Sequence, residues 1–170
     1  MKSIKLLFFV SFFFLGTQAF SQHDFLKINL DFSQAPESNP NRTVTISLYK
    51  QDSIYLVSVK SKTIKRNRIK KTESNIDTVY VIKKEQFERV LMEIEKSYPL
   101  KKEEYPASLE NIYIFTHPNS LTLSVKTKTD EIRMHIVCPT FLPKERNLEQ
   151  FLDVCKEILL LAKMNPKKIL

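Results

Sequence analysis

The sequence predicts an α+β protein, with an antiparallel meander sheet of six or seven strands and two amphipathic helices packed on one face of the sheet. Two observations predict this class. Several short stretches alternate apolar and polar residues, a period of two that places the apolar residues on one face of a strand. Residues 84–97 and 146–163 instead repeat apolar residues at helical spacing, and each stretch follows a β-rich segment. A wide apolar stripe must be buried, so we expect both helices to lie on the apolar face of the sheet.

The first 21 residues predict a cleaved signal peptide. Lys2 and Lys5 precede an apolar run over residues 6–15, and the small residues Ala19 and Ser21 occupy the −3 and −1 positions of a cleavage site. The run is shorter than the roughly 20 residues that a membrane span needs. We therefore expect no membrane span, a periplasmic or secreted location after cleavage near Ser21, and one folded domain over residues 22–170.

The first half of the mature chain predicts three or four strands and a helix. Residues 28–32 alternate and predict a short first strand, which is followed by a loop rich in proline, serine and asparagine. Residues 44–49 and 55–59 predict a hairpin with its turn at 51–53. A short β-rich run at 78–82 leads into the helix over 84–97.

The second half repeats this order. Residues 112–116 predict a strand, and a hairpin over 121–139 has apolar residues on one face. The helix over 146–163 then carries the widest apolar stripe in the chain, which includes Leu152 and Leu159.

The two halves also share a short sequence match. Residues 58–63 read SVKSKT and residues 124–129 read SVKTKT, so the predicted hairpins superpose at a shift of 66 positions, whereas the helices need a shift of 61. A βββα pseudo-duplication explains this match, and the basic residues after the first hairpin are then an insertion. Two unrelated βββα units would share the same periodicity, so both explanations remain open.

Glycine is nearly absent, and this excludes several functions. The only glycine is Gly16, inside the predicted signal peptide. The mature chain therefore cannot contain a phosphate-binding glycine-rich loop, a dinucleotide fingerprint, a glycine-flanked nucleophile elbow or an EF-hand loop. We expect no cofactor, and we expect turns with positive φ to use Asn or Asp, such as Asp52, Asn119 and Asp130.

The charge is concentrated in one segment. The formal net charge is +8, and residues 60–71 contain seven basic residues and no acidic one. Nucleic acid is not the expected partner, because the segment has no aromatic residues to stack on bases and an exported protein rarely meets nucleic acid. The segment is either a solvated run, mobile or extending a sheet edge, or a docking site for an anionic surface. Candidate residues for an anionic partner lie here and on the polar face of the second hairpin: Lys60, Lys62, Lys65, Arg66, Arg68, Lys70, Lys71, Lys126, Lys128, Arg133 and His135.

The cysteines and histidines give weaker predictions. Cys138 and Cys155 are the only cysteines, and in an oxidising compartment they form either a disulfide or two buried thiols. No two of His23, His117 and His135 have the helical spacing of metal ligands, and no cluster of carboxylates accompanies them. We therefore expect no metal site and no catalytic residue, with surface histidines as the simplest interpretation.

From residue 78 onward the chain resembles small, uncharacterised secreted or periplasmic proteins of Gram-negative bacteria that carry signal peptides. The resemblance lies in Lys84, Glu85 and Phe87 at the start of the first helix, and in the tail from Lys144 to Pro166. It covers about half of the chain. Such proteins have no assigned activity, so the resemblance implies export and a single domain and says nothing of chemistry.

The predicted function is that of an exported, non-enzymatic binding protein of the cell envelope. Its partner would be an unknown protein or an anionic envelope component, held by the polar sheet face or the basic segment. The alternatives are an inhibitor or immunity-type protein that blocks one partner, and a small envelope hydrolase with a polar site at His135.

Overall fold

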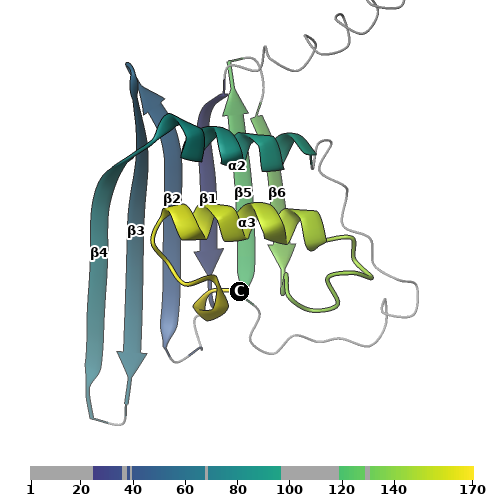
Figure 1. Ribbon diagram of the computed structural model, residues 1–170. Coiled ribbons are helices and arrows are strands. Elements are labelled where there is room, and N and C mark those ends of the chain that lie inside the picture. Colours follow the sequence, from purple (N-terminus) through teal and green to yellow (C-terminus); the bar gives the residue numbers. More distant parts are fainter. Residues whose placement is uncertain (1–24, 36–37, 39, 68, 97–118, 129–130) are drawn as a thin grey trace, which may run out of the picture.

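The computed structural model describes residues 25–35, 38, 40–67, 69–96, 119–128 and 131–170. Within these ranges the chain is α+β, with a six-stranded antiparallel sheet and two α-helices on one face (Figure 1). The strands are β1 (Phe25–Ser33), β2 (Asn41–Gln51), β3 (Ile54–Arg66), β4 (Lys71–Ile82), β5 (Ser120–Thr127) and β6 (Glu131–Val137), and the helices are α2 (Lys84–Lys96), α3 (Glu149–Leu161) and the 3-10 turn η2 (Pro166–Lys168). The predicted fold class is confirmed.

The strands are ordered β4-β3-β2-β1-β5-β6 across the sheet. The first four form a meander joined by hairpins and one longer loop. After α2, the chain resumes at β5, which pairs with the free side of β1, and β6 then completes the second edge. β1 therefore lies inside the sheet, between two strands that are far apart in sequence.

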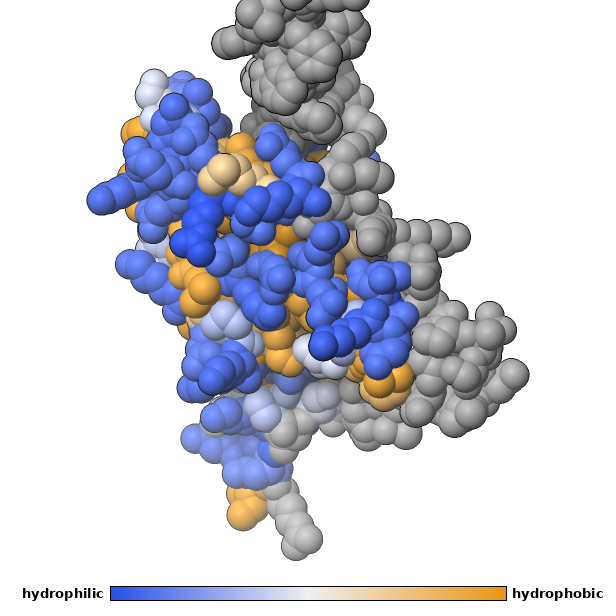
Figure 2. Space-filling model, turned by 45° about the vertical axis from the view of Figure 1, so that its right-hand side comes forward, coloured by the Kyte–Doolittle hydropathy of each residue, from blue (hydrophilic) through white to orange (hydrophobic). Residues whose placement is uncertain are grey.

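The core lies between the sheet and the helices. The register aligns Val59, Ile46, Leu30, Leu123 and Met134 across five neighbouring strands, so their side chains share the face that the helices cover. Phe87, Val90 and Ile94 of α2 and the apolar stripe of α3 are buried against this face. The surface on the helix-bearing side is mostly hydrophilic, with apolar residues visible between the charged ones (Figure 2). None of the described helices is long and apolar enough to cross a membrane.

The described residues of the basic segment are part of a hairpin formed by β3 and β4. Residues 60–66 continue β3, and Lys71 begins β4, so the hairpin extends past the ends of the neighbouring strands (Figure 1). Asn67 closes the turn: its backbone N–H donates to the carbonyl of Lys70 at 3.0 Å, and its side-chain oxygen accepts from the backbone N–H groups of Ile69 and Lys70. β4 is accordingly much longer than the predicted run at 78–82.

The last helix begins three residues later than predicted, and Arg146 gives the reason. This side chain is almost completely buried in the loop between β6 and α3. Its Nη1 donates to the carbonyls of Cys138 at 2.7 Å and Phe141 at 2.9 Å, and its Nη2 donates to the carbonyl of Val137 at 2.8 Å. The guanidinium thus ties the loop to the end of β6, and the helix starts only after Leu148.

Positive φ values occur at more residue types than predicted. Asp52 has φ 54° in the β2–β3 turn, as predicted, and Asn147 also has φ 54°. Cys138, Leu142 and Lys163 adopt positive φ too, although left-handed backbone is costly for residues with a Cβ. The expectation that Asn and Asp alone would serve these positions is therefore wrong.

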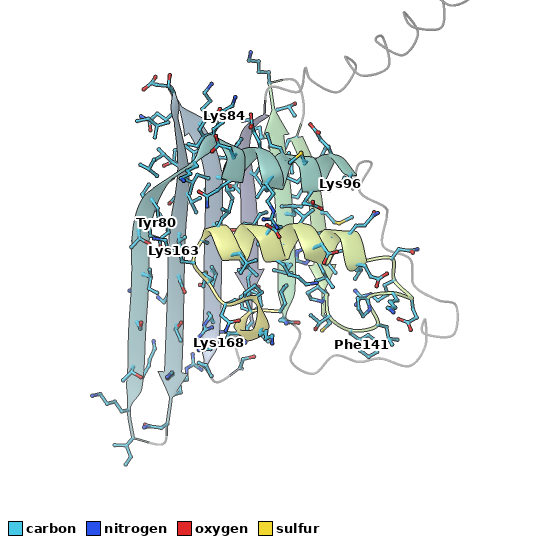
Figure 3. All side chains as sticks on the ribbon, in the orientation of Figure 1. Tyr80, Lys84, Lys96, Phe141, Lys163 and Lys168 are labelled. Carbon is cyan, nitrogen blue, oxygen red and sulfur yellow. The ribbon has the colours of Figure 1, made fainter. Side chains whose placement is uncertain are left out.

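Lys163 occupies the position after the cap of α3 that is usually a glycine. Its backbone N–H donates to the carbonyl of Leu160, and that of Met164 donates to the carbonyl of Leu159, which is the hydrogen-bond pattern of a Schellman motif. Its ammonium lies 4.8 Å from the ring centroid of Tyr80 on β4, and Figure 3 shows the two residues side by side. This cation–π contact connects the end of α3 to the edge of the sheet.

Predictions outside the described residues are the signal peptide over 1–21, the strand over 112–116, the surface positions of His23 and His117, and Asp130 as a turn residue. The matched segments 58–63 and 124–129 begin at Ser58 of β3 and Ser124 of β5, and both strands start a hairpin that is followed by a helix. Because the strand predicted at 112–116 is not described, the pseudo-duplication stays a prediction.

Candidate anion-binding face

The face of the sheet turned away from α2 and α3, which we call the outer face, is polar. The register places Lys27, Asn29 and Asp31 of β1 on it, beside Tyr49, Ser47 and Thr45 of β2 and Lys126, Ser124 and Thr122 of β5. Ser58, Lys60 and Lys62 of β3, Asn75 and Asp77 of β4, and Arg133 and His135 of β6 continue the same rows. This composition follows from the period of two, since the residues between the buried apolar positions must face the other side.

Hydrogen bonds between neighbouring strands hold several of these side chains. Thr45 Oγ1 donates to Asp31 Oδ1 at 2.7 Å, and Ser47 Oγ donates to Asn29 Oδ1 at 2.7 Å. The hydroxyls of Ser33 and Ser120 lie 2.9 Å apart. The centre of the outer face is therefore an ordered polar surface, because each bond restricts two side chains at once.

A shallow open depression of about 660 Å³ lies on this face, and we call it the lysine depression. It is lined by Lys27, Thr45, Ser47, Tyr49, Lys50, Ser58, Lys60 and Lys126. A smaller hollow of about 260 Å³ shares Thr45 and Lys60 with it and extends towards Lys62, Asn75 and Asp77. The lining of the lysine depression combines ammonium groups with four hydroxyl-bearing side chains and contains no carboxylate.

Two of the lysines face each other across strands. Lys27 of β1 is the direct cross-strand partner of Lys126 of β5. Like charges in this position are destabilising, because the two ammonium groups repel each other. Glu131 stands opposite Lys126 on β6, on the side away from Lys27. An anion held between Lys27 and Lys126 would relieve their repulsion.

The other two lysines, Lys60 and Lys50, differ in the groups that their ammonium groups contact. The ammonium of Lys60 lies 3.8 Å from Asp77 Oδ2, and both side chains are exposed, so this ion pair contributes little stability. The ammonium of Lys50 lies 5.8 Å from the ring centroid of Tyr55, a residue that packs against the core. In the register Lys50 stands opposite Tyr55 and so belongs to the helix-bearing face, which leaves Lys27, Lys60 and Lys126 as the lysines of the depression on the outer face.

The structure divides the candidate residues from the sequence into two groups. Lys60 and Lys126 line the lysine depression, and Arg133 and His135 lie on the neighbouring strand β6 of the same face. The remaining described residues lie in or near hairpins and do not line the depression: Lys62, Lys65 and Arg66 on β3, Lys70 in the turn, Lys71 at the start of β4, and Lys128 just after β5. Arg68 is outside the described residues.

Acidic residues of β4 partly compensate the basic hairpin. Lys62 Nζ lies 2.9 Å from Glu73 Oε1, and the hydrogen bond to Lys62 lowers the pKa of the Glu73 carboxyl. Residues 60–71 contain no acidic residue, so only the pairing of β3 with β4 shows this charge compensation.

Sequence reasoning also missed Lys27 and Tyr49. Lys27 alternates with the buried Ile28, but only the strand order places it next to Lys126.

His135 has one contact that bears on the hydrolase alternative. Its Nδ1 lies 2.8 Å from Thr122 Oγ1, across the β5–β6 pair. The Thr122 side chain is buried, so its hydroxyl is poorly placed to meet a substrate. The contact is fully explained as a cross-strand hydrogen bond that orients the imidazole.

The two cysteines are free thiols, so the structure contains no disulfide between them. Cys155 is buried in the apolar stripe of α3, as predicted, whereas Cys138 lies just past β6 with φ 46° and is half-buried. The positive φ takes Cys138 out of the strand alternation that placed it in the core. Burial raises the pKa of both thiols, and for Cys138 the hydrogen bond to the Asn119 backbone and the charge of Arg146 act in the opposite direction.

Across the described ranges, no three His, Cys, Asp or Glu side chains are grouped so that they could hold a metal ion.

Comparison with models of protein families, with curated proteins and with solved structures finds no significant match.

Proposed function

We propose that this chain is an exported, non-enzymatic binding protein that holds a phosphate- or carboxylate-bearing partner on the outer face of its sheet. The observation that carries the proposal is the lysine depression, where Lys27, Lys60 and Lys126 surround a concave surface lined by hydroxyl groups. Ammonium groups attract an anion, and the hydroxyl groups of Tyr49 and Ser58 can donate hydrogen bonds to its oxygen atoms, whereas those of Thr45 and Ser47 already donate to Asp31 and Asn29.

The electrostatics of the free protein favour this role. The opposed pair Lys27 and Lys126 loses stability through repulsion, and the weak exposed pair of Lys60 with Asp77 leaves that ammonium available to a second anion. A bound anion would lower the electrostatic free energy of all three lysines. Two lining side chains, Thr45 and Ser47, are already held by hydrogen bonds to Asp31 and Asn29, so they lose little freedom on binding.

The proposal is tested with two probes that separate the sources of the anion. Vesicles of phosphatidylglycerol and phosphatidylcholine present lipid phosphates, and soluble polyglutamate presents the carboxylates of an acidic protein. We expect binding to one probe, and weaker binding as salt is raised, because the attraction is between exposed charges. Pure phosphatidylcholine vesicles serve as the reference for uncharged lipid.

The matched variants remove equal charge from different places. Replacing Lys27, Lys60 and Lys126 by Gln should weaken binding by roughly a hundredfold, if each contributes about 1 kcal/mol near an anionic surface. Replacing the exposed Lys144, Lys167 and Lys168 by Gln changes the net charge equally and should have a much smaller effect. Equal weakening in both triple variants would show that only net charge matters and would refute the assignment to the depression.

The alternatives make different predictions with the same materials. An inhibitor or immunity-type protein would bind one acidic protein and ignore phosphatidylglycerol vesicles. A hydrolase with its site at His135 would lose activity on an ester substrate in His135→Gln, while anion binding at the lysine depression would stay intact.

A further inference from the structure

The outer edge of β4 is an unusually open strand edge. No described strand pairs with its far side, and the strand is 12 residues long, free of proline and exposed along most of its length. Val79 and Val81 are 55% and 71% exposed. Native proteins usually protect such edges with lysines, prolines, bulges or a covering segment, because the free backbone groups can pair with another chain.

Lysines give little protection to the edge formed by β4. Lys60 and Lys62 lie on β3, one strand inside the edge, and β4 itself carries the single lysine Lys71 at its first position. The edge therefore lacks the lysines that usually prevent pairing, and its backbone and side chains are open to another strand.

We infer that β4 pairs with β4 of a second copy of this chain, antiparallel and centred on Ser74. In this register Lys71 stands opposite Asp77 of the second copy, Glu73 opposite Asn75, and Thr72 opposite the exposed Ile76. The twofold axis through Ser74 makes each pair occur twice. The two Lys71–Asp77 pairs bring opposite charges together across the new strand pair, which is favourable.

Neighbouring registers lack the Lys71–Asp77 pairs. Centring the pair on Ile76 places Lys71 opposite Val81 and Asp77 opposite Asn75, so no opposite charges meet. Centring the pair on Asn75 places Glu73 opposite Asp77, and centring it on Asp77 places that carboxylate opposite itself. Both put like charges face to face, which is destabilising. The Ser74 register also brings Ile69, which is 97% exposed, to the end of the paired stretch beside Val79 of the second copy. Among these registers, only the one centred on Ser74 places opposite charges face to face.

The arrangement also leaves room for the helices. The paired stretch over residues 71–77 lies towards the tip of the β3–β4 hairpin, which projects away from α2 and α3 (Figure 1). In an antiparallel pair the two copies extend in opposite directions from the axis, so their helices stay apart. The two six-stranded sheets would form one continuous sheet, with both lysine depressions on the same side.

A charge-exchange experiment tests the register as well as the association. Sedimentation velocity on the purified protein over a range of concentrations should show a monomer–dimer equilibrium. Lys71→Asp and Asp77→Lys should each weaken self-association by roughly tenfold or more, because each places like charges opposite each other at two positions. A mixture of the two variants should restore association, since the mixed dimer has opposite charges at both positions.

Two controls and two outcomes make the test decisive. Lys83→Asp and Glu145→Lys make the same charge changes at exposed positions outside the paired stretch, and they should leave association unchanged. Circular dichroism must show that all variants are folded. A protein that stays monomeric at the highest concentration overturns the inference, and its edge is then free for a strand of a different partner. Dimers that ignore the charge exchange overturn it as well.

Discussion

Replacing Arg146 by Met should produce one of the largest losses of stability available from a single substitution in this chain. The guanidinium is buried and donates three hydrogen bonds of 2.7 to 2.9 Å, one to the carbonyl at the end of β6 and two to carbonyls of the following loop. A hydrogen bond to a charged group contributes about 1.5 to 3 kcal/mol, and a buried acceptor left without a partner is costly. At the lower end of that range, the three bonds together correspond to roughly 4 to 5 kcal/mol.

Such a loss would be a large part of the 5 to 15 kcal/mol that is typical of a folded domain. Urea unfolding followed by circular dichroism measures it as a shift of the midpoint at constant slope. Lys144→Met, an exposed position in the same loop, is the matched control and should change stability by less than about 1 kcal/mol. Arg146→Lys should fall between the two, because one ammonium cannot reproduce the geometry of the planar guanidinium. If Arg146→Met and Lys144→Met unfold at the same urea concentration, the assigned role of the guanidinium is wrong.

Three further predictions concern the last helix, the thiols and the N-terminus. Leu152→Ala removes a buried side chain of α3 and should cost about 2 to 5 kcal/mol in urea melts, whereas Lys156→Ala on the exposed side should cost little; equal midpoints would show that the helix phase is wrong. Since burial raises the thiol pKa most strongly at Cys155, iodoacetamide should label the half-buried Cys138 first and reach Cys155 only on unfolding; equal labelling rates in the native protein would contradict this. Mass spectrometry of the exported protein should find a mature chain that begins at or near Gln22, and an intact Met1 in the membrane fraction would exclude cleavage.

Local sequence patterns were sufficient for most of the elements. The alternation around Ile46 and Val57 predicted the hairpin of β2 and β3, and Asp52 has the positive φ expected in its turn. The helical spacing around Val90 and Leu152 predicted α2 and α3, because a residue's neighbours within one element determine which face it occupies.

Features that depend on contacts between distant segments could not be predicted. The late start of α3 is caused by Arg146, which looks in the sequence like an ordinary first-turn helix residue and is in fact bound to three carbonyls outside the helix. The lysine depression needs β1 between β2 and β5, and no local pattern shows that Lys27 and Lys126 are neighbours. The acids that compensate the basic hairpin are likewise brought there by strand pairing.

The position of β1 constrains how the chain can fold. Its partner β2 follows within a few residues. Its other partner, β5, is far away in the sequence: Ser33 of β1 pairs with Ser120 of β5, and 87 positions separate the two residues. Until this pairing forms, one side of β1 is an open edge and the apolar face around Leu30 lacks the strands and the helix that complete its cover. Contacts of such long range slow folding, because the entropy of closing the loop is lost before the contact is gained. The meander β1–β4 can therefore assemble early, whereas the finished core requires nearly the whole chain to be present at once.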